Sequence, residues 1–232
     1  IVFGTGSGGA YDASAFQQTK AGLIKAHRWH HVVGSWNGKK KRIYLDGKVV
    51  AEAAFAGTTR PGKTALCIGA YGQEGKAVNF YNGDVAMCAV YDRALNEDQV
   101  KKRFADRGLS VPQNDRLLAC WPFTEEKGKQ VADASDFGRD ARIVNRGTWM
   151  IGGPSFNASA INRHDSQYDP TKDEKRGHGL RLASDEIYNA RWKVNHRFRL
   201  PPDAKSGVYA GRFDFKLKGK PMRYHTSFIV RR

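Results

Sequence analysis

Short runs of β-branched and aromatic residues, separated by turn residues, follow one another along most of the chain. The run Trp29–Trp36 ends at Asn37-Gly38, a dipeptide that tolerates the positive φ values of tight hairpin turns. Arg42–Leu45 and Lys48–Ala51 flank Asp46-Gly47, which predicts a second hairpin with a two-residue turn. The predicted register pairs Leu45 with Lys48, Tyr44 with Val49 and Ile43 with Val50.

Further apolar runs at Ala65–Gly69, Gly83–Tyr91 and Leu117–Phe123 extend the pattern, with glycine-rich turns between them. Helical crossovers do not alternate with these runs, so a parallel sheet is disfavoured. Short strands with regular turn signals are typical of a sandwich, and the sequence therefore predicts an all-β fold.

One helix interrupts the strands after Leu95. Asn96 is suited to cap its N-terminus, and Gln99 at the third helical position completes a capping box. Leu95 and Val100 have the spacing of a hydrophobic staple, and Gly108 is predicted to supply the left-handed residue that ends the helix. The apolar stripe is narrow, so we expect a short surface helix on the sandwich.

The strand pattern divides the chain into three parts. Residues 1–151 form the predicted sandwich, 152–180 are polar without periodicity and indicate a linker or excursion loop, and 181–232 form a small second β unit. Because the sequence begins at Ile1 within a strand-like run and stops just after another, we expect a piece of a longer protein that lacks the first sandwich strands. The runs of the second unit are Trp192–Leu200, Ser206–Phe215 and Tyr224–Val230.

The net positive charge of the chain bears on which partners it could bind. The 232 residues include 39 Lys and Arg against 23 Asp and Glu, a formal net charge of +16 at pH 7. Such a surplus attracts nucleic acid, anionic lipid or acidic polysaccharide. It is spread along the sequence, however, with Lys39–Arg42 as the one tight cluster, and we interpret most of it as solvated surface rather than a nucleic-acid site. No apolar run approaches the roughly 20 residues that cross a bilayer, so no membrane partner is expected.

Three cysteines bear on the cellular compartment. Cys67, Cys88 and Cys120 cannot all pair within the chain, and each lies among apolar neighbours. Buried, reduced thiols in a cytoplasmic protein fit this pattern best. No CxxC pair or cysteine–histidine spacing points to zinc.

The polar residues match no catalytic or metal-binding motif. His30 and His31 are adjacent in a predicted strand, so they point to opposite faces and cannot chelate one ion; one is expected to be packed and the other exposed. The segment Gly4–Gly9 is similar to a phosphate-binding loop but lacks its lysine–serine ending and following helix. No Gly-x-Ser-x-Gly elbow presents a serine for attack.

Two candidate sites stay open at this point. Asp133, Asp136 and Asp140 could supply oxygen ligands to Ca²⁺, although their spacing fits no EF-hand and aspartates also serve turns. Asn157-Ala158-Ser159 has the sequence of an N-glycosylation site, which matters only in a secreted protein.

Four segments resemble the successive signatures of laminin-G-like, concanavalin-type jelly-roll domains. The tripeptides Trp121-Pro122-Phe123 and Asp133-Ala134-Ser135 are also similar to a motif of such domains, usually found near their start. The resemblance implies a laminin-G-like jelly-roll sandwich with one short surface helix. The four segments are Trp29–Val33, Ile43–Gly47, Phe80–Val85 and Val90–Leu95.

The tail resembles the large subunit of N,N-dimethylformamidase and its relatives. In that family a laminin-G-like sandwich and a small β segment precede a catalytic α/β domain that hydrolyses the amide bond of small formamides. The resemblance implies that this catalytic domain and its iron, held by two tyrosines and a glutamate, lie outside the sequence, so no catalytic residue, metal ligand or cofactor is assigned here. The matching segments are Arg176–Leu182, Asp185–Trp192, Leu200-Pro201 and Lys205–Ala210.

Two functions follow from these observations. The first is a non-catalytic packing and assembly portion of a formamidase-like amidohydrolase, partnered by its catalytic domain and by other subunits, with His178 lining an interdomain contact. The second is an anionic-glycan module, in which aromatic side chains stack on sugar rings and lysines meet sulfate or carboxylate groups. Its candidate residues are Trp36, Lys39, Lys40, Lys41, Tyr71 and Tyr81.

Overall fold

The computed structural model describes residues 1–6, 13–59, 65–73, 76–113, 116–156, 177–183, 193–194 and 197–231. Contacts divide the chain into two compact units, Ile1–Glu186 and Ile187–Arg232. The glycosylation sequence at Asn157 and the formamidase-like segment Asp185–Trp192 lie outside the described residues.

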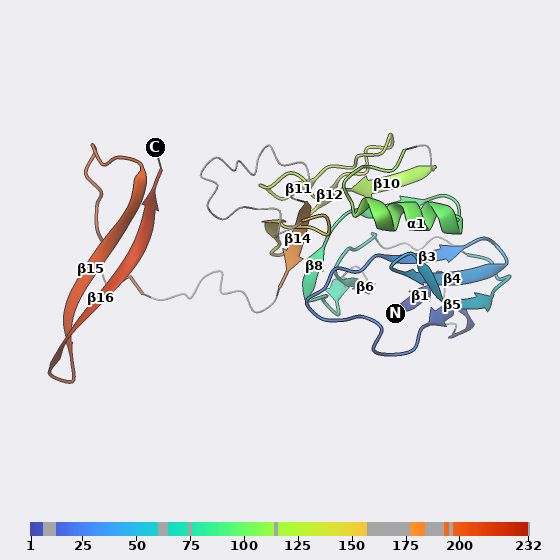
Figure 1. Ribbon diagram of the computed structural model, residues 1–232, viewed down its shortest axis with the longest axis horizontal. Coiled ribbons are helices and arrows are strands. Elements are labelled where there is room, and N and C mark those ends of the chain that lie inside the picture. The colour runs from blue at the N-terminus through green and yellow to red at the C-terminus, as the bar shows by residue number, and fades with distance from the viewer. Residues whose placement is uncertain are drawn as a thin grey trace. The chain divides into compact units, whose positions relative to one another are not determined.

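The first unit consists of small antiparallel sheets with one α-helix in its described part (Figure 1). Its strands are β1 (Val2–Gly4), β2 (Phe16–Gln18), β3 (Val32–Trp36), β4 (Lys40–Leu45), β5 (Lys48–Ala54), β6 (Tyr71–Gln73), β7 (Lys76–Val78), β8 (Gly83–Val85), β9 (Cys88–Tyr91), β10 (Leu117–Trp121), β11 (Gln130–Val131), β12 (Ala141–Arg142), β13 (Thr148–Ile151) and β14 (His178–Leu182). A 3-10 turn, η1 (Ala13–Ala15), precedes β2, and the helix is α1 (Glu97–Asp106).

Two three-stranded sheets organise this unit. One has the order β3–β4–β5, and the other has the order β13–β14–β8, which joins strands far apart in sequence. The remaining strands pair as β1 with β2, β6 with β7, β9 with β10 and β11 with β12.

The turn between β4 and β5 forms at Asp46-Gly47 as predicted. The two residues have φ values of 51° and 78°, which a type I′ turn requires. A β-bulge interrupts the ladder between Ile43 and Tyr44, so the third pair of the predicted register is wrong. The observed pairs are Leu45 with Lys48, Tyr44 with Val49 and Ile43 with Ala51.

Helix α1 begins with the predicted capping box. The Asn96 side chain accepts the Gln99 N–H at 2.9 Å, and the Gln99 side chain accepts the Asn96 N–H at 3.0 Å. The staple residues Leu95 and Val100 are buried together with Tyr44 of β4. Their burial holds the helix beside the β3–β4–β5 sheet, as Figure 1 shows.

The C-terminus of α1 differs slightly from the prediction. Gly108 has the expected left-handed φ of 72°, but Arg107 before it is already left-handed at 52° and caps the helix. Phe104 lies over Gly47, where an added Cβ would approach its ring to 3.2 Å. Gly47 therefore serves both the turn and the close packing of the helix on that turn.

A second core joins β10, β11 and β14. Its buried residues are Ala119, Trp121, Phe123, Val131, Ile143 and Leu180. Because Leu180 belongs to β14, the strand at the end of the predicted linker completes this core.

Three predicted strands differ from the structure. Ala65–Gly69 contains no strand, since the backbone bends there and Gly69 is left-handed at 81°. Gly83–Tyr91 breaks into β8 and β9, because Met87 adopts a left-handed φ of 39°. In Trp192–Leu200, the described residues 193–194 and 197–200 are not in a strand.

The second unit contains a long antiparallel hairpin, β15 (Gly207–Leu217) with β16 (Lys220–Val230). Its turn is Lys218-Gly219, with φ values of 49° and 79°. Both strands were predicted but are longer than the sequence indicated. Among the described helices, none is long and apolar enough to span a membrane.

Candidate functional site

The six candidate glycan-binding residues differ in accessibility. Tyr71 and Tyr81 are 63% and 52% exposed, and the Tyr81 N–H donates to the Gly69 carbonyl at 2.8 Å, which brings Tyr81 beside the segment leading into β6. Trp36 is half-buried and its Nε1 donates to the Phe55 carbonyl at 3.0 Å. The aromatic candidates therefore include two accessible rings and one ring held by the fold.

The three lysines of the cluster also differ in accessibility. Lys39 is exposed, and Lys40 Nζ lies 2.6 Å from Glu52 Oε1. Lys41 is only 1% exposed, and its Nζ donates to Thr5 Oγ1 at 2.7 Å and to the Ala15 carbonyl. Its ammonium also lies 3.6 Å from the centre of the Phe55 ring, a cation–π contact. Lys41 thus ties β4 to the N-terminal segment and is not accessible to a ligand.

The histidine pair forms a carboxylate-centred network. His30 Nδ1 lies 2.9 Å from Asp46 Oδ2, and His30 Nε2 accepts the Lys25 N–H at 3.0 Å. Since Nε2 is an acceptor, the neutral ring carries its proton on Nδ1 and donates it to Asp46. The His31 N–H donates to Asp46 Oδ1 at 2.9 Å, and these bonds fix the Asp46 turn.

Both histidines are partly buried, so the prediction of one packed and one exposed strand residue is wrong; β3 begins only at Val32. Burial lowers the pKa of His31 despite the opposing charge of Asp46, and its ring lies 6.1 Å from that of Phe104. A histidine–aspartate pair is part of many nucleophilic sites, but the fold uses both ring nitrogens of His30.

Asp133 is the most strongly hydrogen-bonded carboxylate of the described residues. It accepts the Cys120 N–H at 2.8 Å, the Ser135 N–H at 2.9 Å, the Ser135 hydroxyl at 2.7 Å and the Arg139 N–H at 2.8 Å. Burial raises the pKa of Asp133, but these hydrogen bonds outweigh it and lower the pKa to about 2.

This geometry argues against the calcium hypothesis. Asp140 likewise accepts the Asp133 N–H at 2.9 Å and the Gln130 amide at 2.8 Å. A carboxylate has about four lone-pair sites, and the four donors around Asp133 occupy all of them, which leaves none for a cation. Among the described residues, no group of three His, Cys, Asp or Glu side chains could hold a metal. The Asp133 network therefore closes a turn against β10.

His178, the predicted interdomain residue, has a partner within the first unit. Its Nε2 lies 2.9 Å from Glu126 Oε1, and the residue pairs with Ile151 of β13. Glu126 has a left-handed φ of 57°, so this ion pair joins β14 to a strained loop.

The three cysteines are free, but they are not all buried. Cys67 is exposed, Cys88 is half-buried and Cys120 is buried, so the prediction is wrong for Cys67. Burial raises the pKa of Cys88 and of Cys120 to about 11. Since the thiolate is the reactive form, these two thiols are suited to packing rather than to nucleophilic chemistry.

The β15–β16 hairpin places its aromatic side chains on one face and most of its polar side chains on the other, where Val208 and Ile229 also lie. Directly paired residues share a face, and successive residues alternate. The pairs of one face are Tyr209 with Phe228, Gly211 with Thr226, Phe213 with Tyr224, and Phe215 with Met222. The pairs of the other are Ala210 with Ser227, Arg212 with His225, Asp214 with Arg223, and Lys216 with Pro221.

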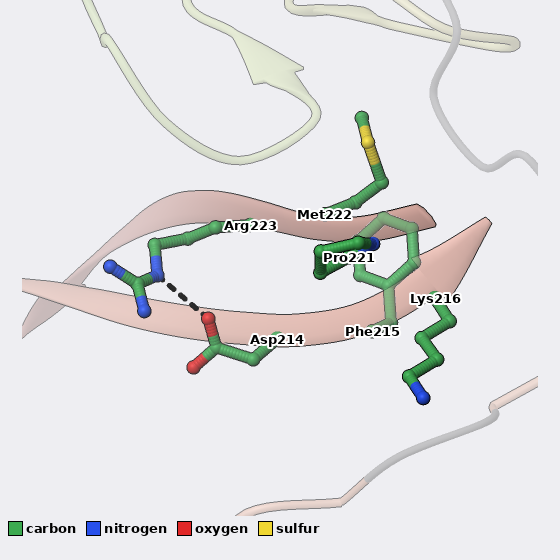
Figure 2. Close-up of a pocket in the computed structure, with 6 residues that line it drawn as sticks. All are labelled: Asp214, Phe215, Lys216, Pro221, Met222 and Arg223. Atoms are coloured by element: carbon green, nitrogen blue, oxygen red, sulfur yellow. Dashed lines mark hydrogen bonds and ion pairs between the residues drawn. The ribbon is translucent and has the colours of Figure 1, made fainter. Parts of the chain in front are cut away.

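We call the first of these sides the aromatic face, and it is open to solvent along much of its length. Phe213, Phe215, Met222 and Tyr224 are between 42% and 63% exposed. Figure 2 shows Phe215 and Met222 on one side of the ribbon and Lys216 on the other. An open depression of about 480 Å³ is lined by residues of both faces near the turn, among them Phe215 and Met222 and the Asp214–Arg223 ion pair of 2.7 Å.

The sequence contained a signal for this face that was not used. Along Tyr209–Leu217 the odd positions are mostly aromatic or apolar and the even positions mostly polar. The alternation identifies one face of a strand, but the long register with β16 is needed to show that both strands contribute aromatic residues to the same side.

Comparison with protein families gives one match. Residues 1–101 match the family model described as the concanavalin A-like lectin/glucanases superfamily. This part of the chain is a concanavalin-like domain. The match includes β1 to β9 and the central β3–β4–β5 sheet.

The concanavalin-like domain confirms the laminin-G-like part of the resemblance and the predicted mostly-β fold with one short helix. The family match does not identify the N,N-dimethylformamidase family. A comparison with curated proteins found no match.

Proposed function

We propose that this chain is a non-catalytic assembly module of a larger amidohydrolase similar to N,N-dimethylformamidase. The catalytic domain and further subunits of that enzyme are its proposed partners. The observation that carries the assembly role is the exposed aromatic face of β15–β16, because a large exposed apolar patch rimmed by polar residues is typical of an interaction surface.

The polar groups of the concanavalin-like domain support a structural role. Lys41, His30 and Asp46 are all engaged in hydrogen bonds that join elements of the domain. Asp133, outside the matched residues, is engaged in the same way. A nucleophile needs an adjacent base that is free to accept its proton, and these groups have no such freedom.

The amide-hydrolysing parent is supported by the sequence of the tail. Four segments there resemble the large subunit of N,N-dimethylformamidase. The segment Asp185–Trp192 lies outside the described part, and the likeness of the other segments is one of sequence, so the argument for the parent enzyme depends on sequence rather than on geometry.

The proposal is tested by assaying the purified chain on N,N-dimethylformamide, with and without added ferrous iron. We expect no release of dimethylamine or formate above the uncatalysed rate, since the proposed chemistry belongs to another domain. Turnover that follows the chain through gel filtration and rises with its concentration would contradict the proposal.

An anionic-glycan module is the second candidate. It is favoured by the exposure of Tyr71 and Tyr81, which lie on neighbouring segments, and by exposed Lys39. Exposed aromatic rings offer stacking surfaces for sugars. The burial of Lys41 removes one of the proposed cations from this site.

A further inference from the structure

The β15–β16 hairpin has two free edges within the described residues. Each strand pairs only with the other, so each leaves one row of backbone N–H and C=O groups without a strand partner. A two-stranded hairpin is marginally stable in water unless it gains a further strand or packs on another element. A further strand or a packed element would cover both the exposed aromatic face and an open edge.

The two edges are not equivalent, because β16 contains Pro221. Within a sheet, proline occurs on an edge strand with its nitrogen facing away from the neighbouring strand. Pro221 pairs with Lys216 of β15, so its nitrogen faces the outer edge of β16 and interrupts that row of donors. No proline occurs in β15, whose outer edge keeps every donor.

Charge indicates the chemistry of the partner. Asp214 is the one acidic residue of the hairpin, and it already contacts Arg223 at 2.7 Å and Arg212 at 3.0 Å. Lys216, Lys218 and Lys220 surround the turn, and no carboxylate of the described residues pairs with them. The end of the hairpin is therefore strongly basic.

We propose that a partner polypeptide adds an extended strand to the outer edge of β15, packs apolar side chains toward the aromatic face and presents carboxylates to Lys216, Lys218 and Lys220. This inference rests on the proposed assembly function and names the surface and the partner chemistry. Strand addition supplies affinity through main-chain hydrogen bonds, and alternating side chains supply specificity.

Three other occupants fit the hairpin less well. Single-stranded nucleic acid needs cations beside the stacking rings, but Lys220 is the one cation of the two strands on the aromatic face, and the others lie on the opposite face: Arg212, Lys216 and Arg223. A lipid surface would leave the open backbone edges without hydrogen-bond partners. A second copy of the hairpin offers one carboxylate, Asp214, which already contacts Arg212 and Arg223, so it has none for the lysines of the turn.

The test uses the whole chain and a fluorescent peptide of about eight residues in which valine alternates with glutamate, a strand-length probe. A valine–lysine peptide of equal length is its charge-reversed control. Ala210→Pro removes a donor from the outer edge of β15, and Ser227→Pro is the matched variant in β16, directly across the ladder. Ser227 lies an even number of positions from Pro221, so its nitrogen also faces outward.

We expect the glutamate peptide to bind more tightly than the lysine peptide. Ala210→Pro should weaken binding about tenfold, which corresponds to the loss of one well-formed contact, while Ser227→Pro should change it little. Hydrogen exchange of the unaltered chain gives a second readout that needs no variant: the peptide should protect the outward-facing amides of β15, which include Ala210, and not the outward-facing amides of β16, which include Ser227.

Equal effects of the two proline variants, peptide-induced protection of the outward-facing amides of β16, or protection of the outward-facing amides of β15 before any peptide is added would overturn the inference. So would tighter binding to phosphatidylserine vesicles or to oligothymidine than to the glutamate peptide. Amide hydrolysis by the chain alone would instead overturn the proposed function and leave a positive peptide result standing.

Discussion

At the scale of single residues, two charged groups, Asp133 and Lys41, act as hydrogen-bond partners for the backbone. The Asp133 carboxylate accepts bonds from three backbone N–H groups and one hydroxyl, which lowers its pKa to about 2. Lys41 acts in the complementary way, since its ammonium donates to the Ala15 carbonyl and to Thr5. Both residues are typical of solvated surface when met in sequence alone.

Asp133→Asn should lower the melting temperature at neutral pH, because the amide presents an NH₂ group or a single oxygen to the same donors. The folded pKa of Asp133 lies below its ordinary value of 3.8, so its contribution to stability is complete above about pH 4 and is lost as pH falls toward about 2. The difference in melting temperature between the original and the variant should therefore shrink between those pH values.

Asp136→Asn is the matched control, since Asp136 is exposed in the same loop. Thermal melts followed by circular dichroism at neutral pH and at several acid pH values measure both variants. A constant difference for Asp133→Asn across the acid range would show that the network does not depend on the charge of Asp133.

The burial of Lys41 could have been predicted from strand periodicity but was not. Lys41 lies two residues before Ile43 on the same strand, so the alternation of β4 places it on the side that Ile43 buries. A lysine in a basic run is ordinarily solvated, and only the approach of Thr5, Ala15 and Phe55 makes its burial favourable.

At the scale of elements, two signals that act between near neighbours were confirmed. The Asn96 capping box and the Asp46-Gly47 turn form as predicted, since each is determined by a few adjacent residues. The predicted strand at Ala65–Gly69 and the continuity of Gly83–Tyr91 were wrong, because strands also need partners at suitable positions.

Asn96→Ala should destabilise the fold by about 1 kcal/mol, because the first turn of α1 loses its side-chain acceptor. Asn96→Asp keeps an acceptor at the helix N-terminus and should lose much less. Urea unfolding at neutral pH measures both. Equal destabilisation by alanine and aspartate would mean that the cap does not stabilise the helix.

At the scale of the whole molecule, the net charge of +16 predicts retention on any polyanion. Retention on heparin therefore indicates glycan recognition only when it exceeds the retention on a cation exchanger that carries no sugar. We expect the chain to elute from both columns at similar salt concentration, because the charge is spread along the sequence.

A glycan site would instead raise the salt needed on heparin alone. Tyr71→Ala and Tyr81→Ala, which leave the charge unchanged, would then lower it, and Lys39→Ala would lower it more than Lys40→Ala, whose ammonium contacts Glu52. That pattern would favour the glycan candidate over assembly as the role of the concanavalin-like domain.

The aromatic face could be predicted from the sequence only in part. The alternation in Tyr209–Leu217 predicts a strand with one apolar face. The register with β16 decides which of its residues lie across from Phe213 and Phe215. A one-residue slip would place them on the opposite face, so the combined surface could not be derived from either strand alone.

The sequence by itself determined the mostly-β class, the cap of α1 and the hairpin turn at Asp46, because these depend on alternation and on residues adjacent in the chain. Tertiary structure decided the burial of Lys41, the saturation of Asp133 and the insertion of β14 between β8 and β13. Each of these arises from groups far apart in the chain, whose approach is set by packing and strand register rather than by local preference.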